Sequence, residues 1–160
     1  MGFVETHVPI CRDPDLYARA SSQGYDSVSN VAMNYSSTTG THGGEMILTA
    51  KCTHSMPLED VILQAAKNAN DEVSRFTCVE TRFGQMSILV IVTYFLCSEG
   101  LSSRNWAILH QISILIRQFK IPFVLYADFN MDPTHIDARG WPVEHNACVL
   151  APNVDSTCLG

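Results

Sequence analysis

The alternation of apolar and polar positions along this 160-residue chain predicts strands interleaved with helices. Apolar runs rich in β-branched and aromatic residues are typical of strands, whereas apolar residues three and four positions apart are typical of helices. Strands are predicted over residues 3–8, 25–33, 45–50, 75–82, 87–95 and 122–126. Helices are predicted from Asp13-Pro14, over 58–68, and from Ser102 or Ser103 to about Lys120. Hairpins combined with helix–strand units indicate a layered α+β fold.

One strand pair and one helix carry the clearest signals. Residues 75–82 and 87–95 flank the turn segment Phe83-Gly84-Gln85, which predicts an antiparallel hairpin. The second strand is apolar at nearly every position, so both of its faces should be buried. The helix near 103–120 has one apolar stripe, formed by Trp106, Leu109, Ile112, Leu115, Ile116 and Phe119.

The stretch Ala127-Asp128-Phe129-Asn130 follows an apolar run, 122–126, that predicts a buried strand. Because side chains alternate along a strand, Asp128 and Asn130 should project together while Phe129 turns into the core. A carboxylate beside a carboxamide at a strand end suits a divalent cation and a phosphate. Alternatively, both side chains cap the turn before Pro133 by hydrogen-bonding the backbone, and the spacing leaves the two interpretations open.

Composition and charge limit the class of protein. Apolar residues make up 46% of the chain and charged residues 16%, which indicates one globular domain over residues 1–160 with a substantial core. The net charge of −6, with ten scattered lysines and arginines, argues against a broad basic surface. A nucleic-acid partner would therefore need a local patch, helped by a bound metal ion.

The sequence also bears on location and on cysteine chemistry. The amino-terminal segment lacks a basic region followed by an apolar core, and the longest apolar run is too short for a membrane helix. We therefore expect an intracellular protein, cytoplasmic or nuclear, that is neither secreted nor bound to a membrane. Six cysteines without a C-x-x-C pair are expected to be reduced and mostly buried. His7 and His135 lie near Glu5 and Asn130 in sequence, and each is either functional or simply exposed.

Five motifs, in this order, resemble the endonuclease/exonuclease/phosphatase superfamily, especially its abasic-endonuclease and retroelement-endonuclease branch. The stretch 4–7 (V-E-T-H) resembles Q-E-T-H, and 40–48 resembles a glycine-rich loop with the strand that follows it. The stretch 91–94 resembles a strand that ends in an active-site tyrosine, and Asn105 opens the next helix as in N-x-x-x-L. The stretch 122–130 resembles P-x-i-l-x-G-D-F-N, with Ala127 in place of glycine.

The resemblance implies a DNase I-like, four-layer α/β/β/α sandwich with a phosphodiesterase site that uses Mg²⁺ or Mn²⁺. It implies that Glu5 binds the metal and that Tyr94 contacts the scissile phosphate. Asp128 would bind metal and activate or orient water, while Asn130 would hold Asp128 and the phosphate. The favoured substrate is nucleic acid.

The chain also departs from the family pattern. The family's first strand and its closing S-D-H segment have no counterpart within residues 1–160, so the domain is expected to be incomplete. Missing strands would leave sheet edges unpaired and favour self-association. The loss of several catalytic groups leaves two functional interpretations, an active phosphodiester hydrolase and a catalytically inactive remnant that binds or supports structure. A third interpretation is a structural domain in which D-F-N only caps a turn.

Overall fold

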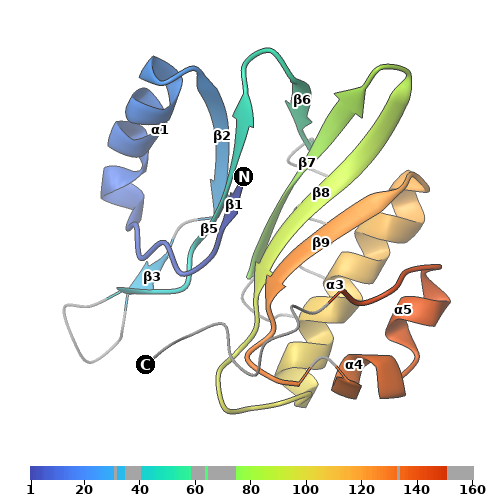
Figure 1. Ribbon diagram of the computed structural model, residues 1–160. Coiled ribbons are helices and arrows are strands. Elements are labelled where there is room, and N and C mark those ends of the chain that lie inside the picture. Colours follow the sequence, from blue (N-terminus) through green and yellow to red (C-terminus); the bar gives the residue numbers. More distant parts are fainter. Residues whose placement is uncertain (31, 35–40, 59–63, 65–74, 133, 151–160) are drawn as a thin grey trace.

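The computed structural model describes residues 1–30, 32–34, 41–58, 64, 75–132 and 134–150, and Figure 1 shows their arrangement. Two main β-sheets face each other, and each carries a helix on its outer face. Helix α1 (Asp13–Ser22) covers the smaller sheet, and α3 (Ser103–Phe119) covers the larger one. The layers therefore run helix, sheet, sheet, helix, which confirms the predicted α+β sandwich.

The smaller sheet is antiparallel and has β5 in its centre. Its strands, in spatial order, are β1 (Gly2–Phe3), β5 (Glu45–Ala50) and β2 (Tyr25–Asn30). Two short strands, β3 (Met33–Asn34) and β4 (Thr41–His42), form a separate pair. The two main sheets meet in a small apolar core made of Ile47, Val79 and Val92.

The larger sheet mixes antiparallel and parallel pairing. Its strands, in spatial order, are β6 (His54–Pro57), β7 (Phe76–Phe83), β8 (Met86–Tyr94) and β9 (Phe123–Asp128). Strands β7 and β8 form the predicted hairpin, and Gly84 turns the chain with a φ of +62°. Strand β9 runs parallel to β8, because α3 carries the chain back across the sheet.

Helix α3 supplies the main core of the larger sheet. Ser102 caps its first turn by accepting the N–H of Asn105 at 3.3 Å. The helix buries Ile108, Leu109, Ile112, Leu115 and Ile116. The predicted stripe was wrong at Trp106, which is 39% exposed because it lies at the edge of the buried arc.

The strand predicted over residues 3–8 was wrong beyond Phe3. Glu5 and His7 both have a φ of +52°, which a regular strand does not allow. The N–H groups of Thr6 and His7 bond instead to the carbonyls of Gly44 and Gly43, at 3.0 and 3.1 Å. The chain therefore leaves the sheet and runs beside the glycine-rich loop.

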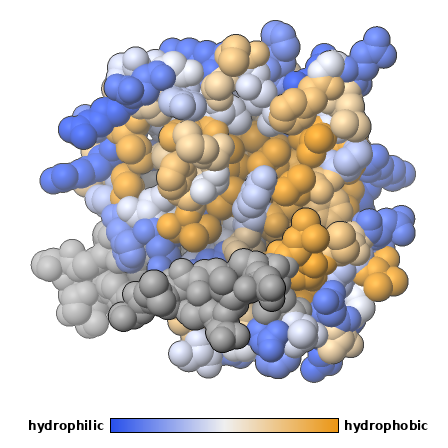
Figure 2. All heavy atoms as spheres, in the orientation of Figure 1, coloured by the Kyte–Doolittle hydropathy of each residue, from blue (hydrophilic) through white to orange (hydrophobic). Residues whose placement is uncertain are grey.

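The prediction that residues 122–126 form a buried strand was correct for one face only. Phe123 and Leu125 pack against the core beneath α3, whereas Val124 and Tyr126 are 39% and 57% exposed. Among the described residues, the second face of the larger sheet is therefore only partly covered at β9. Figure 2 shows apolar side chains gathered in the middle of the face that Figure 1 turns to the viewer.

Other expectations met mixed outcomes. Two short helices that were not predicted, α4 (Thr134–Ala138) and α5 (Trp141–Glu144), follow β9. Cysteine burial was mostly mispredicted, because Cys78 is buried whereas Cys11, Cys52, Cys97 and Cys148 are exposed. The helix predicted over 58–68 lies largely outside the described residues. Among the described helices, none has the length and apolarity needed to cross a membrane.

Candidate functional site

The carboxyl ends of β8 and β9 place Tyr94 and Asp128 side by side. The two residues are partners in the parallel ladder, and the N–H of Phe95 donates to the carbonyl of Asp128 at 3.0 Å. Paired residues in a ladder project from the same face of a sheet. Their side chains share the face that carries Val90 and Val92, which is the face directed at the smaller sheet.

The turn after β9 holds Asp128 and Asn130 in place. One carboxylate oxygen of Asp128 accepts the N–H of Asn130 at 3.1 Å, and the Asn130 amide donates to the carbonyl of Phe95 at 2.9 Å. Asn130 has a φ of +47°, a conformation that asparagine tolerates better than most residues. Phe129 turns inward and stacks on Phe95, with ring centroids 5.3 Å apart. The turn-capping bonds are thus present, and they also orient both polar side chains.

Glu5 reaches the same place from the other sheet. Its carboxylate is hydrogen-bonded to the hydroxyl of Tyr94, which also contacts the Cys97 Sγ at 2.7 Å. A phenol has a single proton, so Tyr94 donates at any moment either to the Glu5 carboxylate or to the Cys97 Sγ. Burial, followed by the hydrogen bonds with Cys97 and Glu5, raises the pKa of Tyr94 above its ordinary value. Tyr94 therefore remains a protonated donor throughout the neutral range.

Two glycines support the segment that carries Glu5. Gly43 and Gly44 have φ values of +72° and +90°. A Cβ on Gly44 would lie 2.5 Å from the Thr6 Oγ1 and 3.2 Å from the backbone nitrogen of Ala32. Only glycine fits this close approach of two chain segments.

Arg75 is a site residue that sequence reasoning missed. Its side chain is 9% exposed, and its guanidinium carbon lies 5.8 Å from the centroid of the Tyr94 ring. A Cβ on Gly43 would lie 3.8 Å from the Arg75 Nη1, so the glycine-rich loop also borders this cation. Within the described ranges, Arg75 forms no ion pair with a carboxylate. The sequence signal that could have identified Arg75 is a single arginine placed directly before an apolar strand.

The donor set fits a magnesium-type ion better than a zinc-type site. Glu5 and Asp128 both adjoin Tyr94, and Mg²⁺ is usually bound by one or two carboxylates and several waters. Over the described part of the chain, no three His, Cys, Asp or Glu side chains gather as a metal cage would need. His7 and His135 are both exposed.

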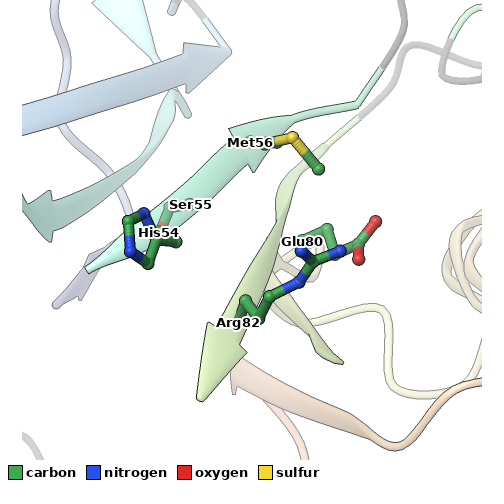
Figure 3. A pocket seen from close by; sticks show the side chains of 5 residues that line it. All are labelled: His54, Ser55, Met56, Glu80 and Arg82. Carbon is green, nitrogen blue, oxygen red and sulfur yellow. The ribbon is translucent and has the colours of Figure 1, made fainter. Parts of the chain in front are cut away.

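A separate hollow of about 310 Å³ is lined by residues of the paired strands β6 and β7, and Figure 3 shows this lining. It is bordered by His54, Ser55, Met56, Glu80 and Arg82. Because β6 and β9 are opposite edges of the larger sheet, this hollow is remote from Asp128.

Comparison with known proteins identifies the fold. No protein-family model and no curated protein matches the sequence. The catalytic domain of human Nocturnin with bound sulfate matches with a TM-score of 0.53 and 15% identity, over 83% of this chain and 51% of that one. The chain shares its fold with the Nocturnin catalytic domain. The chain thus spans about half the length of the Nocturnin domain.

A second solved structure is also similar. The endonuclease domain of TRAS1, a telomere-specific non-LTR retrotransposon, matches with a TM-score of 0.46 and 9% identity. This match covers 90% of this chain and 70% of that one.

Proposed function

We propose that this chain is a nuclease-like domain that hydrolyses phosphodiester bonds of nucleic acid with Mg²⁺ or Mn²⁺. The observation that carries the proposal is the meeting of three distant segments at one end of the sandwich. Glu5 follows β1, Tyr94 ends β8, and Asp128 ends β9 with Asn130 in the turn that follows. Such a cluster of carboxylate, amide and phenol groups suits the handling of a phosphate.

Each side chain has a defined chemical task in this proposal. Glu5 and Asp128 would hold the divalent cation, which neutralises charge on the phosphate when bound. The free carboxylate oxygen of Asp128 would orient the attacking water, while its other oxygen stays bonded to the backbone of Asn130. Tyr94 and Asn130 would donate to non-bridging oxygens, and the buried charge of Arg75 would favour the same anion.

One observation favours a second function, binding of metal and nucleic acid without hydrolysis. The Asn130 amide is already bonded to the carbonyl of Phe95, and Asp128 is bonded to the turn. No histidine or third carboxylate joins Glu5 and Asp128 among the described residues. General acid–base catalysis and charge stabilisation each contribute about a hundredfold or more to rate, so their loss would leave binding alone.

Two measurements on the same variants test the proposal. Nicking of supercoiled plasmid in Mg²⁺ or Mn²⁺ reports hydrolysis, and titration of Mn²⁺ by electron paramagnetic resonance reports metal binding. We expect Asp128→Ala to lose both, while Asp26→Ala, which removes an exposed carboxylate from β2, retains both. EDTA should abolish nicking by the wild type.

The outcomes separate the two functions. Nicking that disappears with EDTA and with Asp128→Ala supports the hydrolase. Binding of Mn²⁺ that needs Asp128, without nicking, supports the binding domain. If Asp128→Ala stays folded and binds Mn²⁺ as the wild type does, neither function is located at this site.

A further inference from the structure

A second hollow, of about 510 Å³, begins two residues beyond Glu5. It is lined by His7, Val8, Pro9, Arg12, Asp15, Leu16 and Arg19. Arg12, Asp15 and Arg19 are spaced by three and four residues, so they follow one side of α1 and the turn that precedes it. Both arginine side chains are exposed, and neither forms an ion pair within the described ranges.

The charge of this hollow opposes the charge of the whole protein. The chain has a net charge of −6 and only ten lysines and arginines, yet two arginines and a histidine border one hollow. Asp15 is the single carboxylate in the lining. The nearby Asp13 accepts a hydrogen bond from the Ser29 hydroxyl at 2.7 Å. Two arginines against one carboxylate give the lining itself a positive balance, which favours an anion, while Asp13 beside Arg12 is an opposing charge outside the lining.

The glycine-rich loop lies between the hollow and the candidate site. Arg75 lies over Tyr94 and borders Gly43, and the N–H of His7 donates to the carbonyl of Gly43 at 3.1 Å. From His7 the lining continues to Arg12 and then Arg19. Arginines thus occur both at the site, as Arg75, and in the neighbouring hollow, as Arg12 and Arg19. The arginine positions are seven residues apart, which corresponds to about 10 Å along a helix, or roughly three nucleotide steps of a B-form strand.

We propose that Arg12 and Arg19 bind the phosphate backbone of a polynucleotide on one side of the bond that lies at Asp128. The inference rests on the proposed function, because it takes the scissile phosphate to lie between Glu5 and Asp128. The hollow recognises a chain of phosphodiesters rather than a single phosphate, since two separate guanidinium groups line it. The binding is backbone-directed and independent of base sequence.

Binding in EDTA tests this inference without any need for hydrolysis. Fluorescence anisotropy is measured with labelled single-stranded DNA, duplex DNA and single-stranded RNA of equal length. The test variant is Arg12→Ala with Arg19→Ala. The matched control is Arg82→Ala with Arg139→Ala, which removes two exposed arginines elsewhere. Thermal melting confirms that both are folded.

We expect the test variant to bind at least about tenfold more weakly than wild type, and the control to bind within about twofold. The slope of log K against log salt should fall by about two in the test variant only. The probe that loses most affinity identifies DNA or RNA as the backbone that the hollow accepts. Equal weakening in the two double variants, or none in the test variant, would overturn the inference.

The two proposals fail in different ways. If plasmid nicking is absent but Arg12 and Arg19 still govern binding, the polynucleotide surface stands without hydrolysis. If Asp128→Ala abolishes nicking while the test variant binds and nicks as wild type, the hydrolase stands and the surface does not.

Discussion

Strands β8 and β9 are neighbours in the same sheet, yet they are covered very differently. Strand β8 is enclosed on both faces, by α3 through Leu89 and Ile91, and by the smaller sheet through Val92. Strand β9 is enclosed by the helix layer only, and Tyr126 on its other face is 57% exposed. The apolar character of a strand therefore does not show whether a second layer extends far enough to cover it.

The candidate site lies where the coverage of the larger sheet by the smaller one ends. Polar groups project from the side of the larger sheet that faces the smaller one, at the end of β8 and β9 where apolar packing stops. Tyr94 is 5% exposed, whereas Glu5, which bonds to it, is exposed. A site at the margin of the core combines fixed side chains with access for a large substrate.

The largest expected effect is a loss of stability at β8, the strand that is covered on both faces. Ile91→Ala removes a fully buried side chain beneath α3 and should cost about 2–5 kcal/mol of unfolding free energy. Tyr126→Ser on the open face of β9 should change it by less than about 0.5 kcal/mol. Urea unfolding measures both, and similar costs for the two variants would show that the open face is covered in solution.

A second prediction compares two glycines, one at the site and one at the far end of the larger sheet. Both have positive φ, but a Cβ on Gly84 meets nothing within 4 Å, whereas one on Gly44 meets Thr6 and Ala32. Gly84→Ala should cost about 1 kcal/mol, and Gly44→Ala about 1–3 kcal/mol more.

Gly44→Ala should also weaken Mn²⁺ binding, because it displaces the segment that carries Glu5. Gly84→Ala serves as the control for this second measurement. Equal loss of stability and of Mn²⁺ affinity in the two variants would contradict the close approach at Gly44.

A third prediction concerns the helix-covered side, where a polar network replaces apolar packing. The buried Trp141 Nε1 donates to the Ser113 Oγ at 2.9 Å, and His145 lies 2.9 Å from the same oxygen. Ser113→Ala leaves the indole N–H without its acceptor and should cost about 1–3 kcal/mol in urea unfolding. Ser103→Ala changes an exposed position of the same helix, so it should lower the unfolding free energy much less. Equal losses in the two variants would show that the network does not stabilise the fold.

The smallest expected effect is a pH dependence at the edge of this network. Burial lowers the pKa of His145, a shift that nearby Glu144 opposes and Arg117 reinforces. The folded state therefore binds this proton less readily than the unfolded state does. The contribution to stability is complete above the ordinary histidine pKa of about 6.5 and is lost as pH falls through the lower value in the folded state.

The variant His145→Phe isolates this contribution. Between neutral pH and about pH 5, the unfolding free energy of the wild type should fall more than that of His145→Phe. Equal falls for the two proteins would mean that His145 titrates alike in both states.

The sequence by itself determined those elements whose signals are local. The span 45–50, the hairpin at Gly84 and the Ser102-capped helix all follow from alternation, turn chemistry and helix capping, which depend on neighbours in the chain. The convergence of Glu5, Tyr94, Asp128 and Asn130 was expected from the family resemblance. The roles of these residues stay predictions.

Only the tertiary structure decided which surfaces are covered and which distant groups meet. The exposure of Val124 and Tyr126 depends on the width of a second sheet that no strand pattern encodes. The end of β1 at Phe3 depends on Gly43 and Gly44, some forty residues away, which accept the hydrogen bonds that a longer strand would make. The position of Arg75 over Tyr94 also depends on tertiary contacts, because Tyr94 lies in a different strand. Local patterns specify elements, whereas burial and charge depend on contacts between them.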